Sequence, residues 1–213
     1  MKRKQKFLPS RMVFSAIGVI GTWMCYSAPA RADLIVTIGS ISANAGSSSN
    51  PLEITLANTG PSPVTIGGFA FGITTANPAI TFTEADTATV PAPYIFSGDS
   101  LFGPIISTLT GATLEASDLF DVFGSGATVN VGKTVGLGHV LFDVAGNAAL
   151  GPSDVTFEIP ATNLADENGN SVSINSLVSG AITVNGGAVP EPATVGLVLC
   201  AFVATALLSR RRA

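Results

Sequence analysis

The sequence predicts an all-β protein, a β-sandwich of about nine short strands between two apolar ends. Three observations favour this class. Short runs of alternating apolar and polar residues recur through the middle of the chain, Gly, Pro and Asn separate these runs, and no long stretch there shows the 3.6-residue period of a helix. The middle, residues 33–187, suits a single domain.

Each predicted strand is justified by its own pattern. The run at 52–56 alternates with period two and is followed by an Asn-Thr-Gly-Pro turn. Val140, Phe142 and Val144 share one face, which predicts a central strand. The glycine pair at 67–68 indicates a bulge or a close approach of backbone. The other predicted strands are 34–38, 64–66, 69–73, 80–83, 94–96, 105–109, 155–159 and 181–184.

Residues 1–32 have the order of a secretory signal peptide. Five cations lie in the first eleven residues, an uncharged and mostly apolar run follows, and small residues end the segment. Cleavage after Ala30 or after Ala32 fits the pattern, and we favour a mature chain that begins at Asp33. The alternative is a retained membrane anchor, but the apolar run is shorter than the roughly 20 residues of a membrane span.

Residues 188–213 have three parts in order. These are a proline-rich segment, an apolar run at 195–208 that predicts a transmembrane helix, and a basic end. The basic cluster would stay cytoplasmic, which leaves the body outside the membrane. A plain tail anchor is the alternative. The proline-rich segment and the basic end consist of Val189, Pro190, Glu191, Pro192, Arg210, Arg211 and Arg212.

This three-part end resembles the PEP-CTERM sorting signal of Gram-negative bacteria and cyanobacteria. The resemblance implies that an exosortase in the inner membrane recognises the Pro-Glu-Pro segment, while the pattern of residues 1–32 predicts that signal peptidase processes the front of the chain. It also implies a precursor held in the membrane by its C-terminal helix, and a product at the cell surface or in an extracellular matrix linked with biofilm. It implies a route and no particular activity.

The order of strands in the body resembles cohesin domains and the related carbohydrate-binding-module sandwiches. The segments that carry this resemblance are 52–56, 68–71, 138–144, 155–157, 163–169 and 180–184. The resemblance implies a cohesin-like, nine-stranded jelly roll. It also implies either protein docking or polysaccharide binding, which are the two uses of that superfamily.

The charge of the body excludes a nucleic-acid partner. Residues 33–187 hold thirteen acidic residues and one basic residue, Lys133, so the net charge of the body is −12. Phosphate contacts require Lys and Arg, which this body lacks. The chain has only two cysteines, which excludes a disulfide-rich scaffold and a four-cysteine zinc site.

The body offers little for catalysis, and we expect no enzyme. His139 is the only histidine, so every histidine-based triad or metal site would need it. Its place in an apolar run indicates a half-buried strand residue instead. No Gly-x-Ser-x-Gly motif positions a nucleophilic serine. The remaining enzymatic alternative is a surface hydrolase that uses two of the scattered carboxylates.

We expect no cofactor, and a calcium ion is the alternative. Asp166, Asn168 and Asn170 place oxygen-bearing side chains within five residues, and oxygen is the ligand that a hard cation prefers. The spacing is not that of an EF-hand. An exposed Asn-Gly turn between two strands is the favoured interpretation of this segment.

Aromatic rings for sugar binding are few. A pyranose stacks its apolar face on a ring, but the only tryptophan lies in the expected signal peptide. The alternative role for the remaining rings is to cover the core. The candidate ligand-binding rings are Tyr94, Phe96, Phe120 and Phe123.

The sequence therefore predicts an exported, non-catalytic protein whose sandwich binds a partner outside the cell. Contact with polysaccharide through loop hydroxyls, amides and Tyr94 is the leading mechanism, and it should show a groove with polar groups and an exposed ring. Protein docking is the first alternative, and it should expose an apolar patch of more than a few hundred Å². A passive matrix protein is the second alternative.

Overall fold

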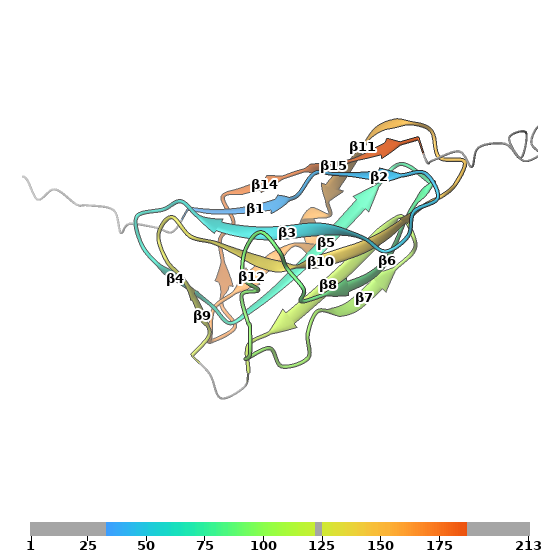
Figure 1. The fold of residues 1–213 in the computed structure, drawn as a ribbon. Helices are drawn as coiled ribbons and strands as arrows, with labels where there is room; N and C mark the ends of the chain where they lie inside the picture. The colour runs from blue at the N-terminus through green and yellow to red at the C-terminus, as the bar shows by residue number, and fades with distance from the viewer. Residues whose placement is uncertain (1–32, 122–124, 187–213) are drawn as a thin grey trace, which may run out of the picture.

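A computed structural model describes residues 33–121 and 125–186 (Figure 1). The expected signal peptide with Ala30 and Ala32, the ring of Phe123 and the expected sorting segment at 188–213 lie outside these residues. The described part of the chain is all-β, with fifteen strands and one short 3₁₀ helix, η1. The predicted all-β fold class is therefore confirmed. None of the helical structure in these two ranges has the length and apolar character that crossing a membrane requires.

The strands are short, and most are joined by turns. Their bounds are β1 (Leu34–Ile38), β2 (Ile41–Asn44), β3 (Asn50–Asn58), β4 (Val64–Ile66), β5 (Gly68–Thr75), β6 (Ile80–Asp86), β7 (Ile105–Leu109), β8 (Thr113–Leu119), β9 (Ala127–Val129), β10 (Thr134–Val144), β11 (Gly151–Phe157), β12 (Asn163–Ala165), β13 (Ser171–Val172), β14 (Ser176–Val178) and β15 (Gly180–Asn185), and η1 spans Ile159–Ala161.

The first sheet has the strand order β14-β1-β3-β10-β6. Its pairs are antiparallel except β1 with β14, which run parallel. The alternation that predicted a strand at 52–56 also predicts which face of β3 is buried. Leu52, Ile54 and Leu56 all point into the core. The residues between them, Glu53 and Thr55, therefore lie on the outer face of this sheet.

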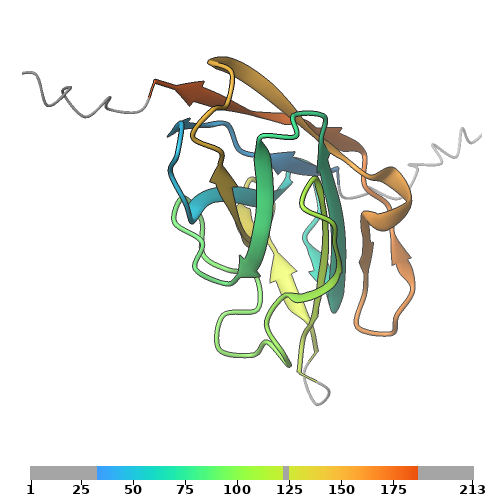
Figure 2. The ribbon, with the colours of Figure 1, turned by 90° about the vertical axis from the view of Figure 1, so that its right-hand side faces the viewer.

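The second sheet has the order β13-β12-β5-β11-β15-β2, and β8 and β7 extend it on the other side of β5. One edge of β5 pairs with β8, and the other edge pairs with β12 and then with β11. Figure 2 shows β12 and β13 in orange at one margin of the molecule. A separate pair, β4 with β9, forms a small third sheet.

The chain crosses from the first sheet to the second at two places. One crossing lies between β1 and β2, and the other lies between β14 and β15. The two crossings are in close contact: a Cβ at Gly180, in the second crossing, would strike the carbonyl oxygens of Gly39 and Ile38 in the first. This division raises the number of strand segments above the predicted nine.

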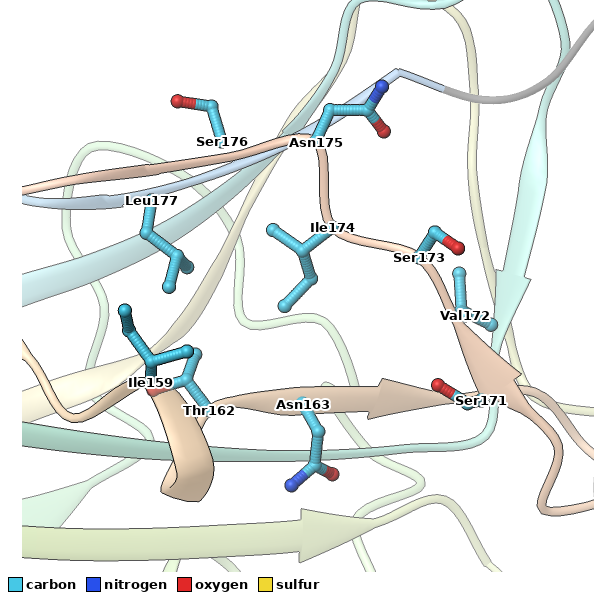
Figure 3. A pocket seen from close by; sticks show the side chains of 10 residues that line it. All are labelled: Ile159, Thr162, Asn163, Ser171, Val172, Ser173, Ile174, Asn175, Ser176 and Leu177. Carbon is cyan, nitrogen blue, oxygen red and sulfur yellow. The ribbon is translucent and has the colours of Figure 1, made fainter.

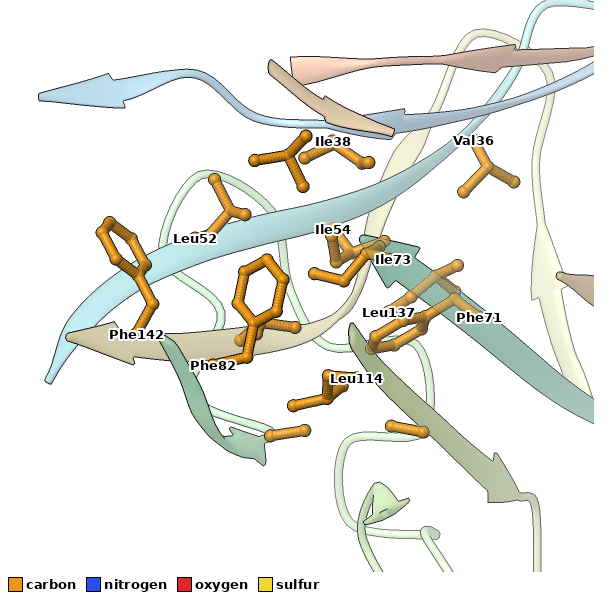
Figure 4. Packing of buried hydrophobic residues seen from close by; sticks show 14 of the residues in the cluster. Val36, Ile38, Leu52, Ile54, Phe71, Ile73, Phe82, Leu114, Leu137 and Phe142 are labelled. Atoms are coloured by element: carbon orange, nitrogen blue, oxygen red, sulfur yellow. The ribbon is translucent and has the colours of Figure 1, made fainter. Parts of the chain in front are cut away.

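The hydrophobic core lies between the two sheets (Figure 4). Val140 and Phe142 are fully buried and Val144 nearly so, which confirms the predicted inward face of β10. Full burial of one such side chain contributes about 1.5–3 kcal/mol to folding. Other large and fully buried members of the core are Phe71, Phe82, Ile54, Leu52, Ile73 and Leu114.

The predicted close approach at the glycine pair is present. A Cβ at Gly67 would lie 2.5 Å from the main-chain oxygen of Asp166, so only glycine lets β12 pass here. A Cβ at Gly68 would meet the side chain of Leu119 at 2.6 Å. The side chain of Leu119 thus covers Gly68 on the outer face of the second sheet.

Candidate functional site

Tyr94 and Phe96 lie in the core. Tyr94 is 7% exposed and Phe96 is 0% exposed, so neither ring can stack on a sugar. The prediction that these two residues bind ligand is therefore wrong, as is the predicted strand at 94–96, where only an isolated bridge joins Tyr94 to Gly136. The connection between β6 and β7 turns inward here because burial of large aromatic side chains is strongly favourable.

The inward rings form one aromatic cluster. The ring of Phe96 lies 5.6 Å from that of Phe69 in a stacked arrangement, and 5.6 Å from that of Phe120 in an edge contact. Tyr94 meets both Phe69 and Phe96 edge-on. Phe120 is half-buried in this cluster, so the alternative role of covering the core holds for Phe120 as well.

Asp118 is a buried carboxylate on β8 that hydrogen-bonds to the connection between β6 and β7. It is 2% exposed and accepts hydrogen bonds from the Tyr94 hydroxyl and the Ser100 hydroxyl, both at 2.5 Å, and from the Leu119 N–H at 2.8 Å. Burial, reinforced by the Asp118 carboxylate, raises the pKa of Tyr94 well above its ordinary value. These contacts serve structure, since Tyr94 and Asp118 are both buried.

The segment at 166–170 is a turn between β12 and β13, as the favoured interpretation predicted. The Asp166 carboxylate accepts the main-chain N–H groups of Asn168 and Asn170 and the side-chain amide of Asn170. These hydrogen bonds lower the pKa of Asp166. No group of three His, Cys, Asp or Glu side chains in the described ranges could hold a metal ion. Calcium binding at Asp166, Asn168 and Asn170 stays a prediction.

His139 lies on the outer face of the first sheet between two carboxylates. Its Nε2 is 2.5 Å from Oε2 of Glu53 on β3, and its Nδ1 is 3.5 Å from Oδ1 of Asp86 on β6. His139 is a strand residue as predicted, but it is 6% exposed and so more deeply buried than expected. Burial raises the pKa of Glu53. No pattern in the sequence predicts that His139, Glu53 and Asp86 lie together.

Exposed apolar side chains lie on the outer face of β7 and β8 and in the connection that precedes β7. Ile105 pairs with Ser117, which places Ile105 diagonally beside Leu119 on that face. Phe102 is close by, because the N–H of its neighbour Leu101 donates to the Leu119 carbonyl. Phe102, Ile105 and Leu119 are 66%, 50% and 52% exposed. We call these three residues the apolar patch.

A groove of about 420 Å³ opens where β12 and β13 diverge from β14 (Figure 3). All ten lining residues are uncharged. Ile174 lies near the middle of the lining, with Leu177 and Ile159 to one side of it. The lining also carries hydroxyl and amide side chains. The lining includes polar side chains with no partner in the described part of the chain, namely Asn163, Ser171, Ser173 and Ser176. No aromatic ring lines the groove.

Comparison with known proteins identifies the fold. No family model matches the sequence, and no curated protein matches it. A cohesin from Clostridium acetobutylicum, solved in solution, is 18% identical with a TM-score of 0.55, over 76% of this chain and 95% of the cohesin. A type I cohesin from Clostridium thermocellum, solved in a cohesin–dockerin complex, is 17% identical with a TM-score of 0.52, over 72% of this chain and 99% of that one.

A non-cellulosomal cohesin from the archaeon Archaeoglobus fulgidus is also similar. It is 14% identical with a TM-score of 0.50, over 72% of this chain and 92% of that chain. Identities this low establish shape and not activity. The matches cover nearly the whole length of each cohesin, and the β-sandwich of this chain therefore has the fold of a cohesin domain.

Proposed function

We propose that this chain is an exported, non-catalytic docking module that binds a partner protein outside the cell. The observation that carries the proposal is the apolar patch of Phe102, Ile105 and Leu119. Ile105 and Leu119 are exposed on an alternating strand face that is otherwise polar, and Phe102 is exposed in the connection just before β7. Such patches are typical of interaction sites. Docking now leads over polysaccharide binding, since Tyr94 and Phe96 are buried.

The surroundings of the patch suggest the chemistry of the partner. Glu115 lies on the same face of β8, and Asp99 and Asp121 are joined by a main-chain hydrogen bond near the end of that strand. The body as a whole is strongly acidic. A partner with an apolar contact surface bordered by Lys and Arg would complement this region. Solved cohesins with this fold have been crystallised with dockerins, which agrees with a protein partner.

A non-catalytic role is supported by the contacts of the buried titratable groups, which are paired with other protein groups. The only histidine is held between Glu53 and Asp86, and Asp118 is committed to three hydrogen bonds. None of these groups lines the groove. A reactive centre requires such groups to face a substrate.

Substitution within the patch tests the docking proposal. We expect Ile105→Lys with Leu119→Lys to weaken capture of a protein from the extracellular matrix of the producing bacterium at least about tenfold, the change that 1.4 kcal/mol produces. The matched control is Val178→Lys, an exposed position on β14 in the other sheet. Quantitative pull-down with the exported protein measures the effect. Equal capture by all three proteins contradicts docking through this face.

Polysaccharide binding is the second candidate function, and the groove favours it. Its uncharged lining, which combines aliphatic side chains with hydroxyls and amides, suits a neutral sugar chain. A glycan array run with the same proteins separates the two functions. A response that survives the patch substitutions supports the groove, and no response to any glycan removes this candidate.

The route of export is a further part of the proposal. We infer that signal peptidase cleaves before Asp33 and that an exosortase processes the chain at Pro190, Glu191 and Pro192, releasing it to the cell surface or matrix. The expected mass of the exported protein therefore lacks the C-terminal helix and its arginines. Mass spectrometry of exported material tests this, and a product that retains Arg212 contradicts the route.

A further inference from the structure

The open edge of the first sheet borders the groove (Figure 3). Among the described strands, its edge strand β14 pairs only with β1, and the Asn175 N–H donates to the Leu34 carbonyl at 2.8 Å. The main-chain groups of successive strand residues point to opposite sides, so the N–H and C=O of Ile174 and Ser176 face away from β1. No described residue forms a hydrogen bond with these main-chain groups. Both residues line the groove, which therefore has unpaired main-chain donors and acceptors at its border.

Aliphatic side chains belong to the same lining. Ile174 and Leu177 are half-buried and pack against the core of the sandwich. Ile159, from η1, joins them in the lining and is 74% exposed. Covering such side chains with an apolar group of a ligand is favourable, because apolar surface is removed from water. The groove thus combines an apolar contact with open main-chain hydrogen-bonding groups.

The charge and composition of the lining restrict the sugars that fit it. A polysaccharide of acidic sugars would be repelled by the body, which holds thirteen acidic residues and one basic residue. The ammonium group of a free amino sugar would find no carboxylate in the lining, since all ten lining residues are uncharged. The lining also has no aromatic ring on which a bare pyranose face could stack. These restrictions favour a neutral sugar that carries an apolar substituent.

We propose that the groove binds a polysaccharide of N-acetylated amino sugars and recognises their acetamido group. The acetamido carbonyl accepts a hydrogen bond from the Ser176 N–H, and the acetamido methyl group packs against Ile159, Ile174 and Leu177. An acetamido group is an amide like the peptide unit, and an open strand edge offers the partners that an amide requires. The inference rests on the second candidate function, sugar binding in the groove, and names the class of sugar. It does not depend on the apolar patch.

Three oligosaccharides that differ only in the substituent at the second carbon of each ring test the proposal. They are tetramers of β-linked N-acetylglucosamine, glucose and glucosamine, which carry an acetamido, a hydroxyl and an ammonium group there. We expect the exported protein to bind the N-acetylglucosamine tetramer at least about tenfold more tightly than the glucose tetramer, because the methyl contact and the amide hydrogen bond both add to the affinity. Isothermal titration calorimetry measures the dissociation constants.

The outcomes separate this inference from the function on which it rests. Equal affinity for the N-acetylglucosamine and glucose tetramers overturns the acetamido proposal and leaves sugar binding in the groove standing. No binding of any tetramer overturns both. The acidic body attracts the cationic glucosamine tetramer without specificity, so this binding should be lost at high salt. A preference for glucosamine that persists at high salt also overturns the proposal.

Ile159→Ser tests the methyl contact. The Ile159 side chain is largely exposed, so the change should leave the stability of the fold unaltered. We expect it to weaken binding of the N-acetylglucosamine tetramer at least about threefold and to leave binding of the glucose tetramer unchanged. Leu150→Ser is the matched control, because Leu150 is 67% exposed and lies outside the groove. Equal binding by the two variants overturns the proposal.

Ser176→Pro and Ser176→Ala test the main-chain hydrogen bond. Proline removes the N–H that faces away from β1, so the sheet loses no hydrogen bond, whereas alanine removes only the hydroxyl. We expect the proline variant to bind the N-acetylglucosamine tetramer at least about fivefold more weakly and the alanine variant to bind it normally. Equal binding by both variants overturns the proposal. A synthetic peptide of alternating Val and Thr is the other probe of an open edge, and binding of this peptide without binding of any sugar also overturns the proposal.

Discussion

Gly180→Ala should lower the free energy of unfolding by about 3 kcal/mol or more. Gly180 is the first residue of β15, where the β14–β15 crossing between the two sheets packs against the β1–β2 crossing. A Cβ there would strike the main-chain oxygens of Gly39 and Ile38 and lie 2.8 Å from the side chain of Ile38. Main-chain atoms of a paired strand cannot move aside as a flexible side chain does, so the whole crossing must shift.

Gly146→Ala is the control for this substitution. Nothing lies within 4 Å of a Cβ at Gly146, and its backbone is not left-handed. We expect this change to alter stability by no more than about 0.5 kcal/mol. Urea denaturation of the two variants measures the difference. Equal stability of Gly180→Ala and Gly146→Ala would show that the crossing is not tightly packed.

Alkaline pH should destabilise the protein through Tyr94. Burial, with the Asp118 carboxylate beside it, raises the pKa of the hydroxyl above its ordinary value of 10.0. Below pH 10 the hydroxyl is neutral in the folded and unfolded chains, so its full contribution is present. Above pH 10 only the unfolded chain releases the proton, and the free energy of unfolding falls by about 1.4 kcal/mol per pH unit.

Tyr94→Phe isolates this effect. At neutral pH the variant should be less stable by about 1–3 kcal/mol, because Asp118 loses one of its donors. Phenylalanine does not titrate, so the stability gap between the two proteins should narrow as the pH rises above 10. Denaturation curves between pH 8 and pH 11.5 measure the gap. A gap that stays constant contradicts the assigned role of Tyr94.

Strands with a clean alternation were predictable. The patterns at 52–56 and in Val140, Phe142 and Val144 match the burial of β3 and β10, because each strand has one face in the core. β8 was not predicted. Its inward series is Leu114, Ala116 and then Asp118, and the carboxylate interrupts the apolar pattern at the third position.

The role of the aromatic residues was not readable from the sequence. Tyr94 and Phe96 lie in a proline-containing segment, and its sequence is compatible both with an exposed loop and with a loop that buries its aromatic rings in the core. Their burial depends on the space that Phe69 and Phe120 leave between the sheets. The apolar patch had one local signal, since Leu119 follows Glu115 and Ser117 on the polar face of an alternating strand.

The chain's own pattern determined its class, an all-strand body with a strongly acidic composition, and it predicts export from the patterns of the two ends. Tertiary structure alone decided which residues meet. Glu53, Asp86 and His139 are far apart in sequence, and strand register brings them together. Alternation assigns a side chain to a face with a period of two residues, but pairing between distant strands depends on the packing of the whole sandwich.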